Sequence, residues 1–347
     1  MTKKDLLAAI ERDDTIENVD LSGLDFSGLD FSGARFEQCI FHNTLFRNAK
    51  IHRTGFQGCD FRGARLEEVD LTSVVWWNID LRGAILRGSI LHKAVLTEAD
   101  FTGADLSAVD FTQATMNNAK LDNANLRRAN LLRALLSDAS LKGADLAGAD
   151  LSRTIFYKAD LTGAILKGAK FYKTFLRDCN LTGQDFRGAS FTMSQAGGAD
   201  FKGCDFTGAD ITQSNFMNAD MTEVKLDNVT GPRAVFLDAK LTGVTMKNAN
   251  LFQSCFEGCN LRVADLTGSN LEQALFPKAM CRGTKFNGVN LANANFSHAN
   301  LTAADFTSAQ VYRANMHRAI EEHTIWTNAN REAALETDPD LAEAEDM

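Results

Sequence analysis

Six histidines are the side chains in this sequence best suited to bind a metal or carry a proton. Zinc sites and catalytic triads bring two or more such side chains together. None of the six has partners at a spacing typical of such sites. His52 and His92 occupy the same position of the repeat described below, but they are forty residues apart, too far to share one ion. We therefore expect no metal site and interpret all six as surface residues: His42, His52, His92, His298, His317 and His323.

Seven cysteines are the other candidate nucleophiles or ligands. Their spacing fits neither a zinc motif nor a disulfide framework. Six occupy positions that the repeat turns inward, where a thiol acts as a small apolar side chain; these are Cys39, Cys59, Cys179, Cys204, Cys259 and Cys281. Free cysteines, a start without a secretory segment and the lack of a run long enough to span a membrane predict a cytoplasmic protein.

Carboxylates are abundant, but they recur at one outward position of the repeat, so no acid/base pair stands out. The sequence contains no phosphate loop, nucleotide-binding fingerprint or nucleophile elbow. An uninterrupted solenoid also supplies no cleft of the kind that small-molecule sites need. We expect no catalytic residue and no cofactor, and hence no enzyme.

The elements that position these side chains are set by a period of five. Large apolar residues recur at every fifth position from Ile16 to Met316, except at Ala196, Gly231 and Cys281. A small residue, usually Ala, stands two positions before most of them. The other three positions carry mostly polar residues and Gly. Neither a helix nor a single strand keeps a period of five over such a length. The pattern predicts a coil built of short flat sides.

The repeat resembles that of the pentapeptide-repeat family, whose loose consensus of Ala, Asp or Asn, Leu or Phe and two freer residues appears here as ADFTG, ADLSA and ADLTG. The resemblance covers roughly Val19 to Asn330. It implies an all-β solenoid, a right-handed quadrilateral β-helix with five residues on each side and twenty in each coil. It implies little about activity, because one fold serves many roles.

A twenty-residue period is also visible on the outside. The residue before each large inward one is usually Asp or Asn, but on one side in four it is mostly apolar: Val75, Val95, Thr115, Leu135, Ile155, Phe175, Gln195, Asn215, Val235, Cys255 and Leu275. With twenty residues in a coil, the span from Ile16 to Met316 corresponds to about 15 coils, each stabilised by its neighbours.

Both ends of the solenoid are expected to be capped by short helices. Residues 1–15 predict a capping helix with Thr2 as its N-cap, and residues 16–330 form the β-helix. Residues 331–347 predict a short helix followed by an acidic, disordered tail after Pro339. This tail supplies most of the net charge of −9, so the body of the protein is close to neutral.

The apolar outward side is the candidate binding surface, because monomers seldom expose a large contiguous apolar patch without a use. Three large residues that follow inward positions on the same side extend it. We call the full set the apolar strip: Val75, Trp77, Val95, Leu135, Ile155, Tyr157, Phe175, Val235, Leu237 and Leu275. A partner protein, a second copy of the chain or a terminal segment could cover it. Aromatic residues such as Trp77 would be its anchors.

Charged residues also form columns. Bases recur at Arg47, Arg87, Arg127, Lys167 and Arg187, and on an adjoining side at Lys93, Arg133, Arg153 and Lys173. Acids recur on a third side at Asp20, Asp60, Asp80, Asp100, Asp160, Asp200 and Asp220. Solvated faces of a repeat account for such columns, and orientation of a partner is the alternative.

Two functional hypotheses follow. The first is a noncatalytic scaffold or adaptor that binds another protein; the overall pattern resembles free-standing pentapeptide-repeat proteins found beside bacterial type VI secretion genes, which implies a role in loading or delivering an effector. The second is a DNA mimic that inhibits or protects gyrase, as in one branch of the family. The nearly neutral body and the basic columns favour the first hypothesis. We expect no contact with membranes or nucleic acid.

Overall fold

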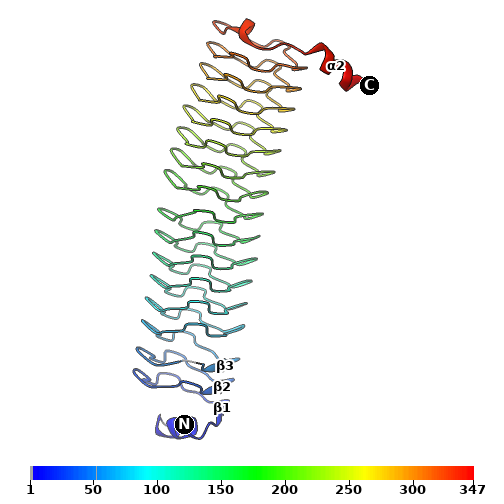
Figure 1. Ribbon diagram of the computed structural model, residues 1–347. Helices are drawn as coiled ribbons and strands as arrows, with labels where there is room; N and C mark the ends of the chain where they lie inside the picture. The colour runs from blue at the N-terminus through cyan, green and yellow to red at the C-terminus, as the bar shows by residue number, and fades with distance from the viewer. Residues whose placement is uncertain (1–2, 52) are drawn as a thin grey trace. The chain divides into compact units, whose positions relative to one another are not determined.

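A computed structural model describes residues 3–51 and 53–347 of the chain (Figure 1). The expected N-cap, Thr2, and His52 lie outside the described residues. The chain divides into two compact units, Met1–Phe175 and Leu176–Met347, which we call unit 1 and unit 2. Each unit is a stack of coils.

Unit 1 begins with helix α1 (Lys3–Glu11), which packs on strand β1 (Thr15–Glu17) and buries Leu6 and Ala9. Strand β1 pairs in parallel with β2 (Arg35–Glu37), which pairs in parallel with β3 (Gly55–Gln57). The partners are twenty residues apart, as in Ile16 with Phe36. The helix therefore covers the first coil, where an open edge would otherwise invite pairing with another chain.

Beyond β3, the coils of both units are joined by isolated parallel bridges, again between residues twenty apart, such as Asp80 with Asp100 and Asn215 with Val235. The large and small positions of the repeat point inward and are buried, and aromatic rings stack from coil to coil, as Phe236 does on Phe256. The expected four-sided β-helix is confirmed, because the inward positions recur every five residues and the pairings every twenty.

The corners of the coils place one residue in five in the left-handed backbone region, for example Gly83 with φ 64° and Asn78 with φ 50°. Glycine reaches this region without strain and Asn tolerates it, which explains their frequency at this position. Val263, a β-branched residue with φ 53°, is an exception and costs the fold some stability.

The end of unit 2 differs from the expectation. A 3-10 helix, η1 (Arg331–Ala333), is followed by helix α2 (Pro339–Asp346), which forms where a disordered tail was expected. Asp338 caps α2 by accepting hydrogen bonds from the backbone N–H groups of Asp340 and Leu341, and Pro339 takes the first helical position, where its missing N–H costs nothing. No helix in the described part of the chain is long and apolar enough to cross a membrane.

Candidate protein-binding surface

Most outward Asp and Asn residues form turns with their own backbone. Asp20 accepts a hydrogen bond from the N–H of Ser22 at 2.9 Å, and Asp100 accepts one from Thr102 at 3.0 Å. This Asx turn satisfies the backbone donor two residues further on and favours the corner. Each such bond contributes on the order of 1 kcal/mol.

The apolar residues of the strip cannot form this Asx hydrogen bond, because their side chains have no acceptor. Val75 and Ile155 offer no acceptor to the N–H groups of Trp77 and Tyr157, for which we find no side-chain acceptor among the described residues. At Leu275, the residue two positions on is Pro277, which has no N–H to donate. Val75 and Ile155 therefore occupy the strip at the expense of this hydrogen bond, whereas after Leu135 the N–H of Ser137 donates to Asn117 instead.

In unit 1, the two residues at the start of the strip are its most exposed members. Val75 and Trp77 are each 64 % exposed, Phe175 is 43 % and Tyr157 is 38 % exposed. The other strip residues of this unit are half-buried; these are Val95, Leu135 and Ile155. Parallel bridges join the outward residues of this side from coil to coil, including Val75 with Val95 and Ile155 with Phe175, and Thr115 stands between Val95 and Leu135 in this ladder.

A hollow of about 400 Å³ lies beside Trp77. Val75 and Trp77 line one part of it, and Phe56 and the backbone of Gly55 line another. Gly55 stands one coil before Val75 at the same outward position, and a Cβ added there would meet nothing within 4 Å. The missing side chain leaves room for an apolar group to pack against the Trp77 indole. The amide side chains of Gln38, Gln57 and Asn78 complete the lining and offer donors and acceptors.

The strip of unit 2 is shorter. Leu275 is 42 % exposed, and Val235 and Leu237 are half-buried. Helix α2 lies on this side of the unit but is attached further along the chain, at His298, His317 and Arg318, and Leu341 in the helix is itself exposed. The tail therefore leaves Leu275 accessible.

The expectation that all six histidines are isolated surface residues is wrong for His317, which is buried, and His298 lies beside it. His298 and His317 both contact Glu345 of α2, with Nε2 to carboxylate distances of 3.2 Å, and Arg318 Nε lies 3.2 Å from the same carboxylate. Glu345 has a lowered pKa, chiefly because His317 donates a hydrogen bond to it. The contact was missed because Glu345 is distant in sequence and reaches the histidines only through the docked helix.

The cluster acts as a hydrogen-bonded attachment of the helix. The three ligand atoms lie within 4.8 Å of one another, which is close enough for a metal. However, the backbone N–H of Asp338 points at Nδ1 of His317, with an N to N distance of 3.2 Å. Nδ1 is therefore an acceptor, and the ring proton is on Nε2, where it faces Glu345. A metal on Nε2 would move this proton to Nδ1, against the N–H of Asp338, and Arg318 would repel the cation.

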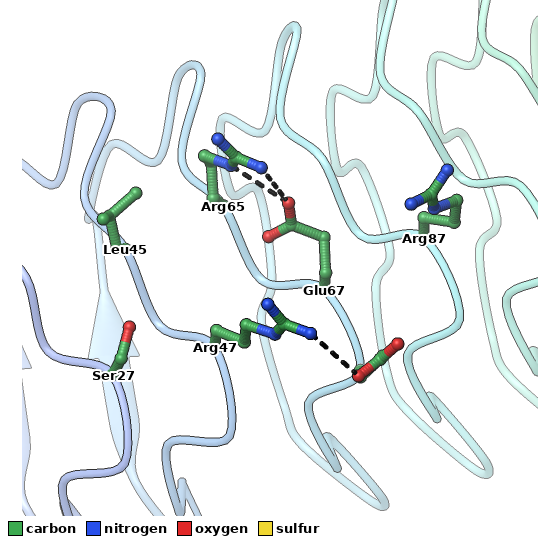
Figure 2. Close-up of a pocket in the computed structure, with 7 residues that line it drawn as sticks. Ser27, Leu45, Arg47, Arg65, Glu67 and Arg87 are labelled. Atoms are coloured by element: carbon green, nitrogen blue, oxygen red, sulfur yellow. Dashed lines mark hydrogen bonds and ion pairs between the residues drawn. The ribbon is translucent and has the colours of Figure 1, made fainter.

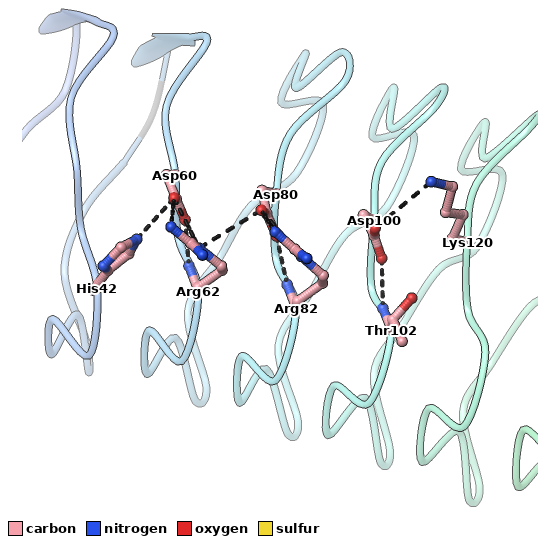
Figure 3. A network of polar contacts seen from close by, with 8 residues as sticks. All are labelled: His42, Asp60, Arg62, Asp80, Arg82, Asp100, Thr102 and Lys120. Atoms are coloured by element: carbon pink, nitrogen blue, oxygen red, sulfur yellow. Dashed lines mark hydrogen bonds and ion pairs between the residues drawn. The ribbon is translucent and has the colours of Figure 1, made fainter.

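The acidic column is paired with bases rather than open (Figure 3). Arg62 lies 2.6 Å from Asp60 and Arg82 lies 2.6 Å from Asp80, and His42 also contacts Asp60 at 2.8 Å. We call this set, with Asp100 and Lys120, the ion-pair ladder. Burial alone would raise the pKa of Asp60, but hydrogen bonds from Arg62 and His42 outweigh it and lower the pKa to about 2.

Figure 2 shows a second hollow, of about 310 Å³, on the column that contains Arg47 and Arg87. Its positive charge is partly neutralised, because Arg65 lies 2.7 Å from Glu67 and Arg47 lies 3.9 Å from Glu68. The hollow is therefore a mixed-charge surface.

The cysteines lie where the repeat predicts them. The six inward ones are buried, and Cys255 is half-buried. Burial raises the pKa of Cys204 to about 12, so its thiol is not a nucleophile at neutral pH.

Comparisons with known proteins identify the repeat. The family model for pentapeptide repeats matches in 8 copies, over residues 16–38, 30–67, 64–103, 104–143, 134–171, 164–203, 185–222 and 284–320. A model of a pentapeptide repeat region matches residues 209–286. The comparison with curated protein sequences gave no match.

Three solved structures are similar to the chain. HetL, a pentapeptide repeat protein involved in regulating heterocyst differentiation in Nostoc sp., is 24 % identical over 78 % of this chain and 91 % of its own, with a TM-score of 0.20. QnrB1, a plasmid-mediated fluoroquinolone resistance protein, is 14 % identical over 67 % and 97 %, with a TM-score of 0.29. A protein of the Arabidopsis thaliana thylakoid lumen is 32 % identical over 32 % and 68 %, with a TM-score of 0.15. Such low TM-scores carry nothing about binding partners, but the family models span most of the chain, which belongs to the pentapeptide-repeat family.

Proposed function

We propose that the protein is a noncatalytic scaffold or adaptor that binds another protein through the apolar strip of unit 1. The observation that carries the proposal is the pair Val75 and Trp77, exposed beside a hollow, on the side where the Asx hydrogen bonds are missing. Burying this pair and the hollow would remove apolar surface from water, and a central aromatic anchor is typical of protein interfaces. The shorter strip of unit 2, with Val235, Leu237 and Leu275, is proposed as a secondary contact.

The test is a double variant, Trp77→Asp with Phe175→Asp, used as bait in a lysate of the source organism. The matched control, Thr102→Asp with Thr162→Asp, adds the same charge on the side of the ion-pair ladder. We expect the strip variant to lose partners that the wild type and the control retain. Retention of the same partners by a folded strip variant would refute the proposal. Analytical ultracentrifugation of the same proteins separates a partner from a second copy, because loss of a dimer in the strip variant alone would identify self-association.

The narrower role as an accessory of type VI secretion rests on the sequence pattern alone and stays a prediction. The alternative role as a DNA-mimicking inhibitor or protector of gyrase is less well supported. A DNA mimic needs an open row of negative charges, whereas Asp60, Asp80 and Asp220 are paired with bases here. Inhibition of gyrase supercoiling by the purified protein would favour the alternative.

A further inference from the structure

A row of bases borders the apolar strip of unit 1. Wherever the strip side carries an apolar residue between positions 95 and 175, a base stands two positions earlier at the corner, as Lys93 does before Val95 and Arg133 before Leu135. Where the side carries Thr115 instead, the corner residue is Gln113. We call the four bases the basic rim: Lys93, Arg133, Arg153 and Lys173. Base and apolar residue thus occur together, coil by coil.

The basic rim has no acidic partners. Among the described residues, no carboxylate lies within ion-pair distance of these four side chains, and Lys173 lies over the ring of Tyr172 at 5.2 Å. Some other bases of unit 1 are paired, since Arg82 lies 2.6 Å from Asp80 and Arg127 lies 2.6 Å from Asp145. Others in the described part of the unit, such as Arg87 and Lys167, also make no ion pair. The rim is distinguished by position, because its four unpaired bases share one column beside the strip.

The rim bases also lie at corners where the backbone is in the left-handed region, which glycine adopts most easily. Lys93, Arg133, Arg153 and Lys173 have φ values of 56°, 60°, 57° and 55°. At equivalent corners on other sides of the coils the chain uses glycine, as at Gly83, and also other residue types, such as Asn118 and Ala108. A long basic side chain in the left-handed region costs stability relative to glycine.

The opposite border of the strip differs in charge. Glu98 and Asp138 stand at the corner that follows the strip residues, where Lys158 is the one base of that column in this unit. The strip is therefore apolar in the middle, basic on one border and mostly neutral or acidic on the other. Electrostatic complementarity fixes the register and orientation of a partner on such a surface.

We infer that the strip binds an acidic amphipathic segment of a partner protein. Its apolar side chains pack on the strip, with one of them in the hollow beside Trp77, and its carboxylates lie along the basic rim. The inference rests on the proposed function and adds the chemistry of the partner. Unit 2 provides an internal example of the same chemistry, because the acidic helix α2 is held through Glu345 and Asp346 by Arg318.

The experiment uses two labelled synthetic probes and the full-length chain. Both probes are amphipathic peptides with the same Leu and Trp residues, and they differ in carrying either Glu or Lys at every polar position. Fluorescence anisotropy measures their affinity at low and at physiological salt. We expect the Glu probe to bind at least about tenfold more tightly than the Lys probe, and more weakly as salt is added. Equal binding of the two probes, or no binding of the Glu probe, overturns the inference.

Two neutralised variants locate the binding. Replacing the basic rim (Lys93→Gln, Arg133→Gln, Arg153→Gln, Lys173→Gln) should weaken the Glu probe about tenfold and flatten its salt dependence. The control replaces four paired bases (Lys120→Gln, Arg127→Gln, Lys142→Gln, Lys170→Gln) and should bind like the wild type. If the rim variant binds like the wild type while Trp77→Asp with Phe175→Asp loses the probe, the inference fails and the proposed function stands. If the strip variant also binds normally, both fail.

Discussion

Two sides of the same coils in unit 1 use their outward residues in opposite ways. On the side of the ion-pair ladder, Asp80 accepts the backbone N–H of Arg82 and pairs with its guanidinium. On the side of the strip, Val75 occupies the equivalent outward position, makes no such bond and is exposed to solvent. The buried positions and the pairing between coils follow the same rule on both sides. The difference shows that the buried positions and the pairing between coils do not require an ion-paired outward residue, so an apolar residue can replace it there.

The largest difference in stability is expected between substitutions of an inward residue and of its outward neighbour. Trp76 is fully buried and stacks on Phe61 with ring centroids 5.5 Å apart. We expect Trp76→Ala to lower the free energy of unfolding by about 3–5 kcal/mol, because it leaves a large cavity. Trp77→Ala should change it by no more than about 0.5 kcal/mol. Urea unfolding followed by circular dichroism measures both, and a comparable loss in Trp77→Ala would place Trp77 in the fold rather than on a binding surface.

The next effect is the loss of one rung of the ion-pair ladder. Asp80→Val removes the Asx hydrogen bond and leaves Arg82 without its carboxylate, so we expect a loss of about 1–2 kcal/mol in the free energy of unfolding. Asp80→Asn retains the acceptor for the backbone N–H and should lose less than half as much. Equal losses of unfolding free energy in the two variants would mean that Asp80 stabilises the fold through its ion pair with Arg82 and not through the turn.

Acid should weaken the ladder and leave the strip unaffected. Because the pKa of Asp60 is lowered to about 2 from an ordinary value of 3.8, its ionised form stabilises the fold above pH about 4, and this contribution is lost as the pH falls towards 2. We expect ionised Asp60 to contribute on the order of 1–2 kcal/mol to the free energy of unfolding, after allowing for solvent screening. Unfolding measured between neutral pH and pH about 2 should show a smaller loss in Asp60→Asn than in the wild type. A pH dependence unchanged in this variant would contradict the assignment.

The smallest expected change in stability directly compares the strip side with the side of the ion-pair ladder. Val75→Asp introduces the missing acceptor for the N–H of Trp77 and removes an exposed apolar side chain. We expect the free energy of unfolding to stay the same or rise by up to about 1 kcal/mol, while binding of the partner falls. Denaturation and the binding assay on the same sample measure the two effects. A clear loss of stability would show that the apolar ladder of the strip supports the fold itself.

The sequence was a good guide to the fold because one period of five specifies both the inward residues and the corners. It also placed the strip correctly on the outside, although Val95, Leu135 and Ile155 are less exposed than Val75 and Trp77. The ion-pair ladder was missed but could have been recognised, since Asp60 and Asp80 are each followed two positions later by Arg. The contact of Glu345 with His298 and His317 could not, because it depends on how α2 docks, which no local pattern encodes.

The twenty-residue spacing of the coil pairings has a consequence for how the surface can change. Inserting five residues would preserve the inward pattern and add one more side, so the solenoid could still close and stack. Every strip residue after the insertion would, however, move to the neighbouring side, away from Val75 and Trp77. The inward pattern would tolerate this shift, but contacts between particular residues of neighbouring coils, such as Arg62 with Asp80, would lose their register at the insertion. A partner that binds along the strip, as proposed above, would therefore accept changes in the length of the chain only in whole coils.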